Sequence, residues 1–271
     1  MDDHRMSHTS RMNRRIPPDR ADELFFYAKR VVADDEGWRI DVDPAHCLTG
    51  YADEVDVAYP LRELGVDERR IANGRTVYEG RIPFSAGVVL LVEGTFVMLY
   101  RDADAPSDPC KWTSPAGRCD HDPTQTAYRE LYEELLVRAN GRPAVVEVGD
   151  ESAVARYETT LRERGFDHPR EQWLRLPASV PDRYDSLHVP VETHYGDERH
   201  VGRFWPYWDD AKETLELRTI LEIQRPGDGP SLSFSDPEYG RRVEQFTLDD
   251  LLSLSSDELV PANAALREEI S

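Results

Sequence analysis

The sequence predicts a protein of mixed α and β structure, in the α+β or α/β class. Residues 85–92 form a near-continuous apolar run, as in a strand that is buried on both faces. The turn residues 93–94 follow, and the apolar segment 95–101 returns, which predicts a β-hairpin. Further along, residues 124–137 carry apolar side chains at every fourth position, the spacing of a helix with one apolar face.

The N-terminal quarter is divided by composition. Residues 1–20 are polar, carry several arginines and end in two prolines, so we expect a disordered tail. Residues 22–33 have the apolar spacing of an amphipathic helix. We assign residues 21–79 to an N-terminal extension and residues 80–271 to the main domain, with an insertion at about 138–200.

The remaining elements are predicted from short apolar or alternating segments. Residues 76–83 fit an edge strand. Later strands are predicted at 145–148, 203–207, 215–224 and 243–246. Thr247 is placed to cap a short helix, with Asp249 and Asp250 in its first turn, and residues 256–269 predict a closing helix.

The predicted helix at 124–137 carries an acidic face opposite its apolar one. Glu130 lies three residues before Glu133 and four before Glu134, so the carboxylates are neighbours and repel one another. A hard divalent cation would offset this repulsion, and Mg²⁺ takes carboxylates together with substrate phosphates. Arg129 is placed to brace one carboxylate. In a chain this rich in Asp and Glu, the alternative is an ordinary solvated acidic face.

This segment resembles the Nudix box, whose pattern is G-x5-E-x7-R-E-U-x-E-E-x-G-U, with U a bulky aliphatic residue. Gly117 matches the first glycine, and the second half is matched by Arg129, Glu130, Leu131, Glu133, Glu134 and Val137. The segment between Gly117 and Arg129 is two residues shorter than the pattern. His121 stands where the loop glutamate is expected, and Leu136 replaces the late glycine.

The resemblance implies a Nudix-like α/β/α sandwich, with a mixed sheet between helices. It implies hydrolysis of the diphosphate bond in a nucleoside diphosphate linked to another group, with Mg²⁺ or Mn²⁺ as cofactor. It implies metal ligation by Glu130, Glu133, Glu134 and the carbonyl group of Gly117. In the same way, Glu130, Glu133 and Arg129 are the expected catalytic residues.

Other interpretations keep the fold and change the chemistry. The shortened loop also fits a catalytically impaired module that binds a nucleotide or regulates a partner. Cys119-Asp120-His121 is similar to a motif of isopentenyl-diphosphate isomerases, which share the fold. Members of the family often take a further acid from a later strand or loop, and Glu213 and Glu216 are the candidates here.

Composition limits the partners and the compartment. The net charge of -20 repels free nucleic acid, whereas a small nucleotide can still bind through a cation and local arginines. The three cysteines contain no CxxC motif, which favours a reducing cytoplasm. No apolar run is long enough for a membrane span, and no apolar signal segment starts the chain. A homodimer is a further possibility.

The basic residues are almost all arginine. Of 33 basic residues, only Lys29, Lys111 and Lys212 are lysine, against 53 Asp and Glu. Such a surface is typical of proteins that stay soluble in strong salt, so a halophilic source is our hypothesis. A high-GC genome would also favour arginine over lysine. We expect KCl to raise the unfolding temperature by screening like charges. An unfolding temperature that does not change across a KCl series would contradict it.

Overall fold

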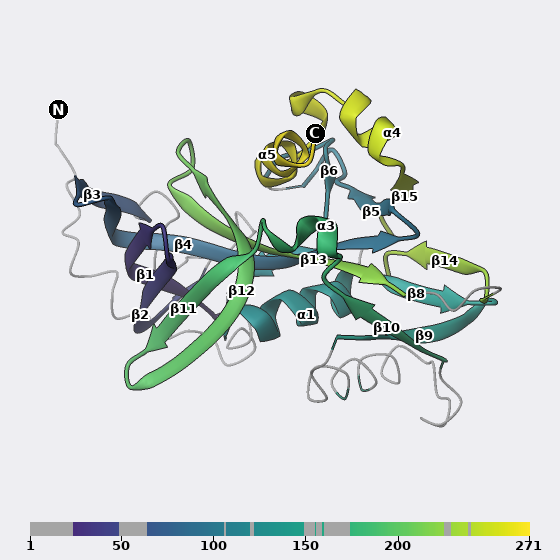
Figure 1. Ribbon diagram of the computed structural model, residues 1–271, viewed down its shortest axis with the longest axis horizontal. Coiled ribbons are helices and arrows are strands. Elements are labelled where there is room, and N and C mark those ends of the chain that lie inside the picture. Colours follow the sequence, from purple (N-terminus) through teal and green to yellow (C-terminus); the bar gives the residue numbers. More distant parts are fainter. Residues whose placement is uncertain are drawn as a thin grey trace, which may run out of the picture.

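In the computed structural model, a mixed sheet lies between helix α1 (Pro123–Glu134) on one face and helices α4 (Leu248–Ser253) and α5 (Pro261–Glu269) on the other (Figure 1). This arrangement confirms the expected sandwich. The residues that the structure describes are 24–48, 64–105, 107–119, 122–148, 155, 159, 174–224, 229–237 and 240–271. The predicted tail at 1–20 lies outside them.

Strand β4 (Arg75–Val92) joins the two halves of the sheet. Its first half pairs antiparallel with β1 (Leu24–Asp34) and with β3 (Gly65–Ala72). Its second half pairs in parallel with β13 (Thr214–Ile223) and antiparallel with β5 (Thr95–Tyr100). The apolar run predicted at 85–92 is therefore buried in the centre of the sheet, as its composition indicates.

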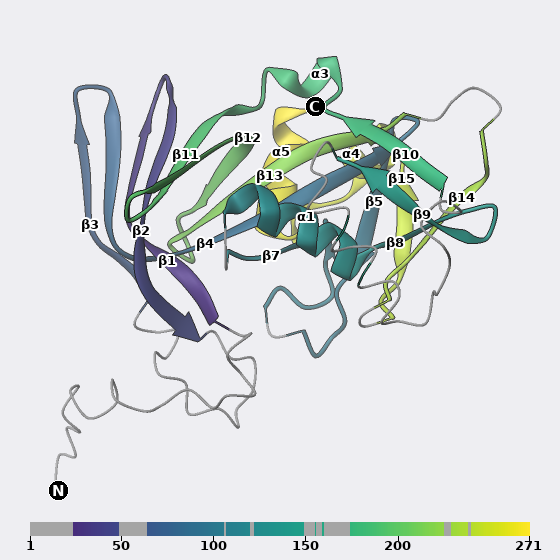
Figure 2. The same cartoon turned by 90° about the horizontal axis from the view of Figure 1, so that it is seen from below.

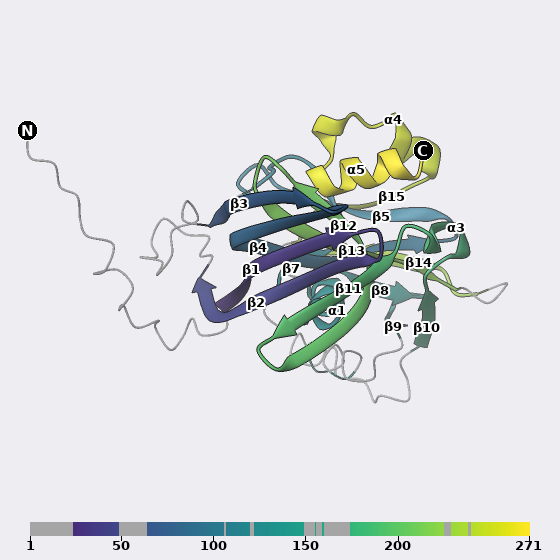
Figure 3. The ribbon, with the colours of Figure 1, turned by 60° about the vertical axis from the view of Figure 1, so that its left-hand side comes forward.

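The other strands extend the sheet on both sides of β4. Its main path runs β14 (Leu232–Ser235), β8 (Leu136–Ala139), β9 (Arg142–Glu147), β10 (Leu174–Ser179), β13, β12 (Glu198–Asp209), β11 (Val189–Tyr195), β2 (Gly37–Leu48), β1, β4, β5 and β15 (Val243–Phe246). Two short strands, β6 (Trp112–Thr113) and β7 (Ala116–Arg118), pair with β5 and β4. The hairpins β1–β2, β3–β4 and β11–β12 project together from one end of the molecule (Figures 2 and 3).

Two N-terminal predictions are wrong. Residues 22–33 were expected to form a helix, but Leu24–Asp34 is strand β1. The segment is rich in aromatic and β-branched residues, which favour a pleated, half-buried surface, and β2 and β4 supply partners on both sides. For the same reason residues 76–83 are not an edge strand, because β1 and β3 flank this part of β4.

Most later elements match their predictions. Strands β12 and β15 cover the predicted segments 203–207 and 243–246, and strands β9 and β13 end one residue before the predicted ends at 148 and 224. Thr247 caps α4 through a reciprocal capping box with Asp250. The closing helix begins later than predicted, because residues 256–258 form one 3₁₀ turn and α5 starts at Pro261.

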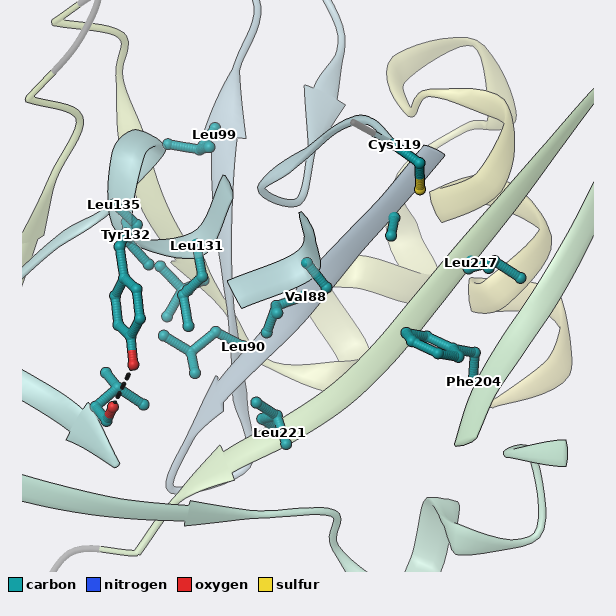
Figure 4. Packing of buried hydrophobic residues seen from close by; sticks show 14 of the residues in the cluster. Val88, Leu90, Leu99, Cys119, Leu131, Tyr132, Leu135, Phe204, Leu217 and Leu221 are labelled. Atoms are coloured by element: carbon teal, nitrogen blue, oxygen red, sulfur yellow. Dashed lines mark hydrogen bonds between the residues drawn. The ribbon is translucent and has the colours of Figure 1, made fainter. Parts of the chain in front are cut away.

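Two hydrophobic clusters hold the layers together. The larger lies between the sheet and α1, where Leu131 and Leu135 pack near Leu90 and Leu99 (Figure 4). The smaller lies under α4 and α5 and contains Trp112. Each face of the central sheet is thus covered by helix.

The segment predicted as an insertion is described only in part. The polar sequence of residues 150–164, followed by a glycine, predicts a helix there, and this segment lies almost wholly outside the described residues. The part from Leu174 onward contains β10, the short helix α3 (Asp182–Asp185) and β11. None of the helices that the structure describes has the length and apolar character needed to cross a membrane.

His188 ties α3 to the centre of the sheet. Its side chain is buried, and its Nε2 atom accepts a hydrogen bond from the Ile220 N–H at 3.0 Å. The Nδ1 atom must then carry the proton and donate to the Tyr184 carbonyl oxygen, 3.0 Å away. Burial lowers the pKa of His188, and the charge of Arg203 adds to this, while the bond to Tyr184 and the charge of Asp185 oppose it.

This arrangement predicts a loss of stability in acid. Below the ordinary pKa of 6.5 the unfolded chain takes up a proton that folded His188 resists, so the free energy of unfolding falls as the pH drops. Urea unfolding between about pH 7.5 and about pH 5.5 measures this. In His188→Gln the side chain does not titrate, and we expect a smaller loss over the same range. An equal loss in both proteins would contradict the prediction.

Candidate functional site

The acidic helix α1 begins one residue earlier than its sequence pattern predicts. The cap is Asp122, and its Oδ1 atom accepts from the N–H groups of Thr124 and Gln125 at 2.9 and 3.0 Å. Pro123 occupies the first helical turn, where the absence of an N–H has no cost. In the sequence, the dipeptide Asp122-Pro123 was the signal that could have located this helix start. His121 lies outside the described residues.

The helix also ends earlier than predicted. It stops at Glu134, and Leu135 is already extended, with its N–H still bonded to the Leu131 carbonyl oxygen at 3.0 Å. Leu136 and Val137 continue as strand β8, both buried. Glu133 and Glu134 are therefore the last two residues of α1.

Gly117 brings strand β7 against this helix. It pairs with Ala86 of β4, and a side chain at this position would overlap the carboxyl group of Glu130. Glycine suits this position because of the close approach, since an added side chain would force the Glu130 carboxyl group to move. Gly117 and Glu130, two residues of the box pattern, therefore lie in contact.

Arg129 interacts with two of the box glutamates. Its Nη2 atom donates to Glu130 Oε1 at 2.6 Å, and its Nε atom lies 3.5 Å from Glu133 Oε2. The Arg129 side chain is 23% exposed and that of Glu133 is 39% exposed. Arg129 therefore lies between the buried carboxylate of Glu130 and the partly exposed carboxylate of Glu133, and it braces Glu130 as the sequence led us to expect.

Glu130 is the box acid whose charge is most clearly affected by its surroundings. Burial raises the pKa of its carboxyl group to about 7, against the opposing effect of Arg129, and the charges of Glu134 and Glu133 raise it further. A carboxyl group that titrates near neutral pH is suited to accept or donate a proton there. The clustering of like charges predicted from spacing is therefore present.

Glu134 is buried between a backbone amide and an arginine. Its Oε2 atom accepts from the Ala116 N–H at 2.9 Å, and its Oε1 atom accepts from Arg241 Nη2 at 2.8 Å. Arg241 also pairs through Nε with Asp236, which has a fully buried side chain. Sequence reasoning missed Arg241 and Asp236, because both lie more than a hundred residues after Glu134 and no sequence pattern connects them to the box.

The donor set of this site fits a hard divalent cation in its chemistry. Carboxylate and carbonyl oxygens are the ligands that Mg²⁺ and Mn²⁺ prefer. A cation would also relieve the charge repulsion that helps to raise the pKa of Glu130. The side chains themselves are paired with arginines, and within the described part of the chain no three His, Cys, Asp or Glu residues are grouped so that they could hold a metal.

The two later acids are not brought to the box. Glu213 Oε2 accepts from the Val66 N–H at 2.9 Å, which ties the β12–β13 turn to the start of β3. Glu216 pairs with the buried Arg218. Because side chains alternate along a strand, Glu216 faces away from α1, toward which Leu215 and Leu217 point.

Cys119 does not have the properties of a catalytic thiol. It is completely buried in the cluster beneath α1 (Figure 4), and burial strongly raises the pKa of its thiol. A reactive cysteine needs an accessible thiolate. This geometry gives no support to the isomerase-like interpretation. Cys119→Ser is a direct check of that interpretation, which would require this change to abolish activity.

Comparison with known proteins gives one family and several distant structures. The model of the NUDIX domain matches residues 81–216, half of the chain. A search of curated proteins finds no significant match.

The solved structures with similarity are weakly related. A MutT protein from Methanosarcina mazei Go1 shares 12% identity over 70% of this chain and 92% of that chain, with a TM-score of 0.35. A C. elegans Ap4A hydrolase in a binary complex shares 15% identity over 69% of this chain and 95% of that chain, with a TM-score of 0.33. A bifunctional NMN adenylyltransferase/ADP ribose pyrophosphatase from Francisella tularensis, complexed with AMP and a Mn ion, shares 14% identity over 70% of this chain and 42% of that chain, with a TM-score of 0.38.

Proposed function

Because the chain belongs to the Nudix family, we propose that it hydrolyses the diphosphate bond of a nucleoside diphosphate linked to another group. The observation that carries the proposal is the contact between Gly117 and the buried carboxyl group of Glu130, on a helix that also ends in Glu133 and Glu134. A small nucleotide-type substrate fits a chain whose net charge of -20 disfavours binding to long nucleic acids.

We assign the cofactor to Mg²⁺ or Mn²⁺. Glu130, Glu133, Glu134 and the carbonyl group of Gly117 are the residues that would hold it. When bound, such a cation neutralises charge on the diphosphate and lowers the pKa of a coordinated water. The protein contributes the placement of these oxygens, because the Ala116 N–H fixes one oxygen of Glu134 at 2.9 Å.

Arg129 and Glu130 have separate roles in this proposal. Arg129 orients the Glu130 carboxylate through the 2.6 Å bond to Oε1. Whichever of Glu130 and Glu133 stays outside the metal shell would accept the proton of the attacking water. In the cation-free protein the pKa of Glu130 is raised to about 7, and a bound cation would lower it, so that the carboxylate would be ionised and available at neutral pH. Glu133, the most exposed of the three, lies toward the solvent side, where a charged substrate arrives.

The test is a screen of nucleoside diphosphate compounds with purified protein and Mg²⁺ or Mn²⁺, measuring released phosphate or nucleoside monophosphate. We expect product that depends on the added cation and disappears with a chelator. The absence of product from every compound with either cation would overturn the proposal.

One observation favours a second candidate function, a module that binds a nucleotide without turnover. Glu134, a proposed ligand, is already paired with Arg241. If this pairing persists with substrate, the site can bind but cannot assemble for hydrolysis. Calorimetry that detects nucleotide binding, together with no product after long incubation, would distinguish this function from hydrolysis.

A further inference from the structure

Arg241 bridges two buried acids that come from different parts of the fold. Its Nη2 atom lies 2.8 Å from Oε1 of Glu134, on the last turn of α1. Its Nε atom pairs with Oδ2 of Asp236, the residue directly after β14. The backbone N–H of Arg241 donates to the same oxygen at 3.3 Å. Arg241 itself lies two residues before β15. One guanidinium group thus joins the box helix to the β14–β15 connection.

All three side chains are withdrawn from water. The exposed fractions are 9% for Arg241, 10% for Glu134 and 0% for Asp236. A buried carboxylate without a counter-charge is costly, and the guanidinium group of Arg241 supplies positive charge to both acids. Burial alone would lower the pKa of Arg241, but the two carboxylates raise it above its ordinary value, so that it stays charged.

The Oε1 atom of Glu134 is therefore already occupied by a positive charge that belongs to the protein. A divalent cation on the same carboxylate would be repelled by Arg241 at short range, and the two would compete. Asp236 matters here because it is a second, fully buried partner. Arg241 can release Glu134 and still remain paired, without carrying an uncompensated charge through the interior.

We propose that Arg241 competes with the metal cation for Glu134. Arg241 holds Glu134 in the cation-free protein, and when a cation binds it releases Glu134 and keeps its pairing with Asp236. This inference rests on the proposed function, because it concerns the same carboxylate. It implies that the cation affinity of the site is set by how strongly Arg241 holds Glu134. It also couples cation binding to the β14–β15 connection, since Arg241 lies within it.

The test measures the Kd for Mn²⁺ alone, by calorimetry or by electron paramagnetic resonance, without substrate. We expect Arg241→Gln to bind Mn²⁺ about tenfold more tightly or better than the wild-type chain, because a charge-assisted hydrogen bond to Glu134 no longer competes. Arg242→Gln is the matched control. Arg242 pairs with Glu244 and stacks on Trp112, and its Mn²⁺ affinity should equal that of the wild type.

A double variant tests whether the change in Mn²⁺ affinity depends on Glu134. In Glu134→Gln, the further change Arg241→Gln should give no gain in Mn²⁺ affinity, because the contested carboxylate is absent. Arg241→Lys keeps the positive charge but loses the forked guanidinium group that reaches both acids. We therefore expect this variant to bind Mn²⁺ more tightly than the wild type. It replaces Arg241→Gln in the test if Arg241→Gln does not fold. Circular dichroism establishes which variants are folded.

The outcomes separate the two proposals. An unchanged or weaker Mn²⁺ affinity in the folded Arg241 variants, or no detectable binding in any of them, overturns the competitor role even if the wild type hydrolyses a substrate. Tighter binding that vanishes in the Glu134→Gln background supports it. Such binding without any hydrolysis would overturn the proposed function and leave the competitor role in place.

Discussion

Glu134→Gln is expected to lower the cation-dependent rate of diphosphate hydrolysis by about 100-fold or more, because Glu134 is a proposed metal ligand and such a ligand supplies several kcal/mol of transition-state stabilisation. The change keeps the size of the side chain, and its amide oxygen can still accept from the Ala116 N–H. What is lost is the negative charge at the end of α1. Steady-state kinetics with Mg²⁺, comparing kcat and kcat/KM with those of the wild type, measures the loss.

The control for this change is Glu198→Gln on strand β12. The Glu198 side chain is 75% exposed, and its change removes the same charge from the net total. It should leave the rate unchanged. Rates equal to those of the wild type in Glu134→Gln would remove this residue from the reaction, and thermal unfolding of both variants excludes loss of fold as the cause.

Leu131→Ala is expected to reduce the free energy of unfolding by about 2–5 kcal/mol, the range for large-to-small changes in a packed core. Leu131 is 1% exposed and faces the sheet from the centre of α1, near Leu90 and Leu135 (Figure 4). The change leaves a cavity below the helix that carries the box acids. Urea unfolding, with the midpoint and slope fitted together, measures the difference.

Leu252→Ala provides the matched change at a more exposed position. Leu252 lies on α4 and is 37% exposed, so its removal costs less apolar burial. We expect a loss of well under half of that for Leu131→Ala. Equal losses in the two variants would mean that the cluster under α1 does not dominate the stability of the fold.

The central features of the fold could be predicted because their signals are local. The apolar run 85–92 with its turn at Glu93–Gly94 gives the hairpin of β4 and β5, and both turn residues have the positive φ that such turns need. The four-residue apolar spacing gives α1. Its end at Glu134 could not be predicted, because the pairing of β8 with β9 and β14 overrides the helical preference of the following leucine residues.

The missed features depend on partners distant in the sequence. The helical spacing of residues 22–33 is also compatible with a strand, and only pairing with residues 76–83 of β4 decides between them. In the site, the positions of Arg129 and Glu130 follow from one helix and were predicted. Arg241 and Asp236 reach Glu134 only through the pairing of β14 and β15 with β8 and β5.

The continuity of β4 limits how this protein can be shortened for experiments. A chain begun at residue 80 would match the boundary expected from sequence, yet it would cut through β4 and remove β1, β2 and β3. Strand β11 would then lose its partner β2, and its bare edge would be open to pairing with other chains. Truncation at this boundary should therefore promote aggregation, and biochemical assays should retain the N-terminal strands.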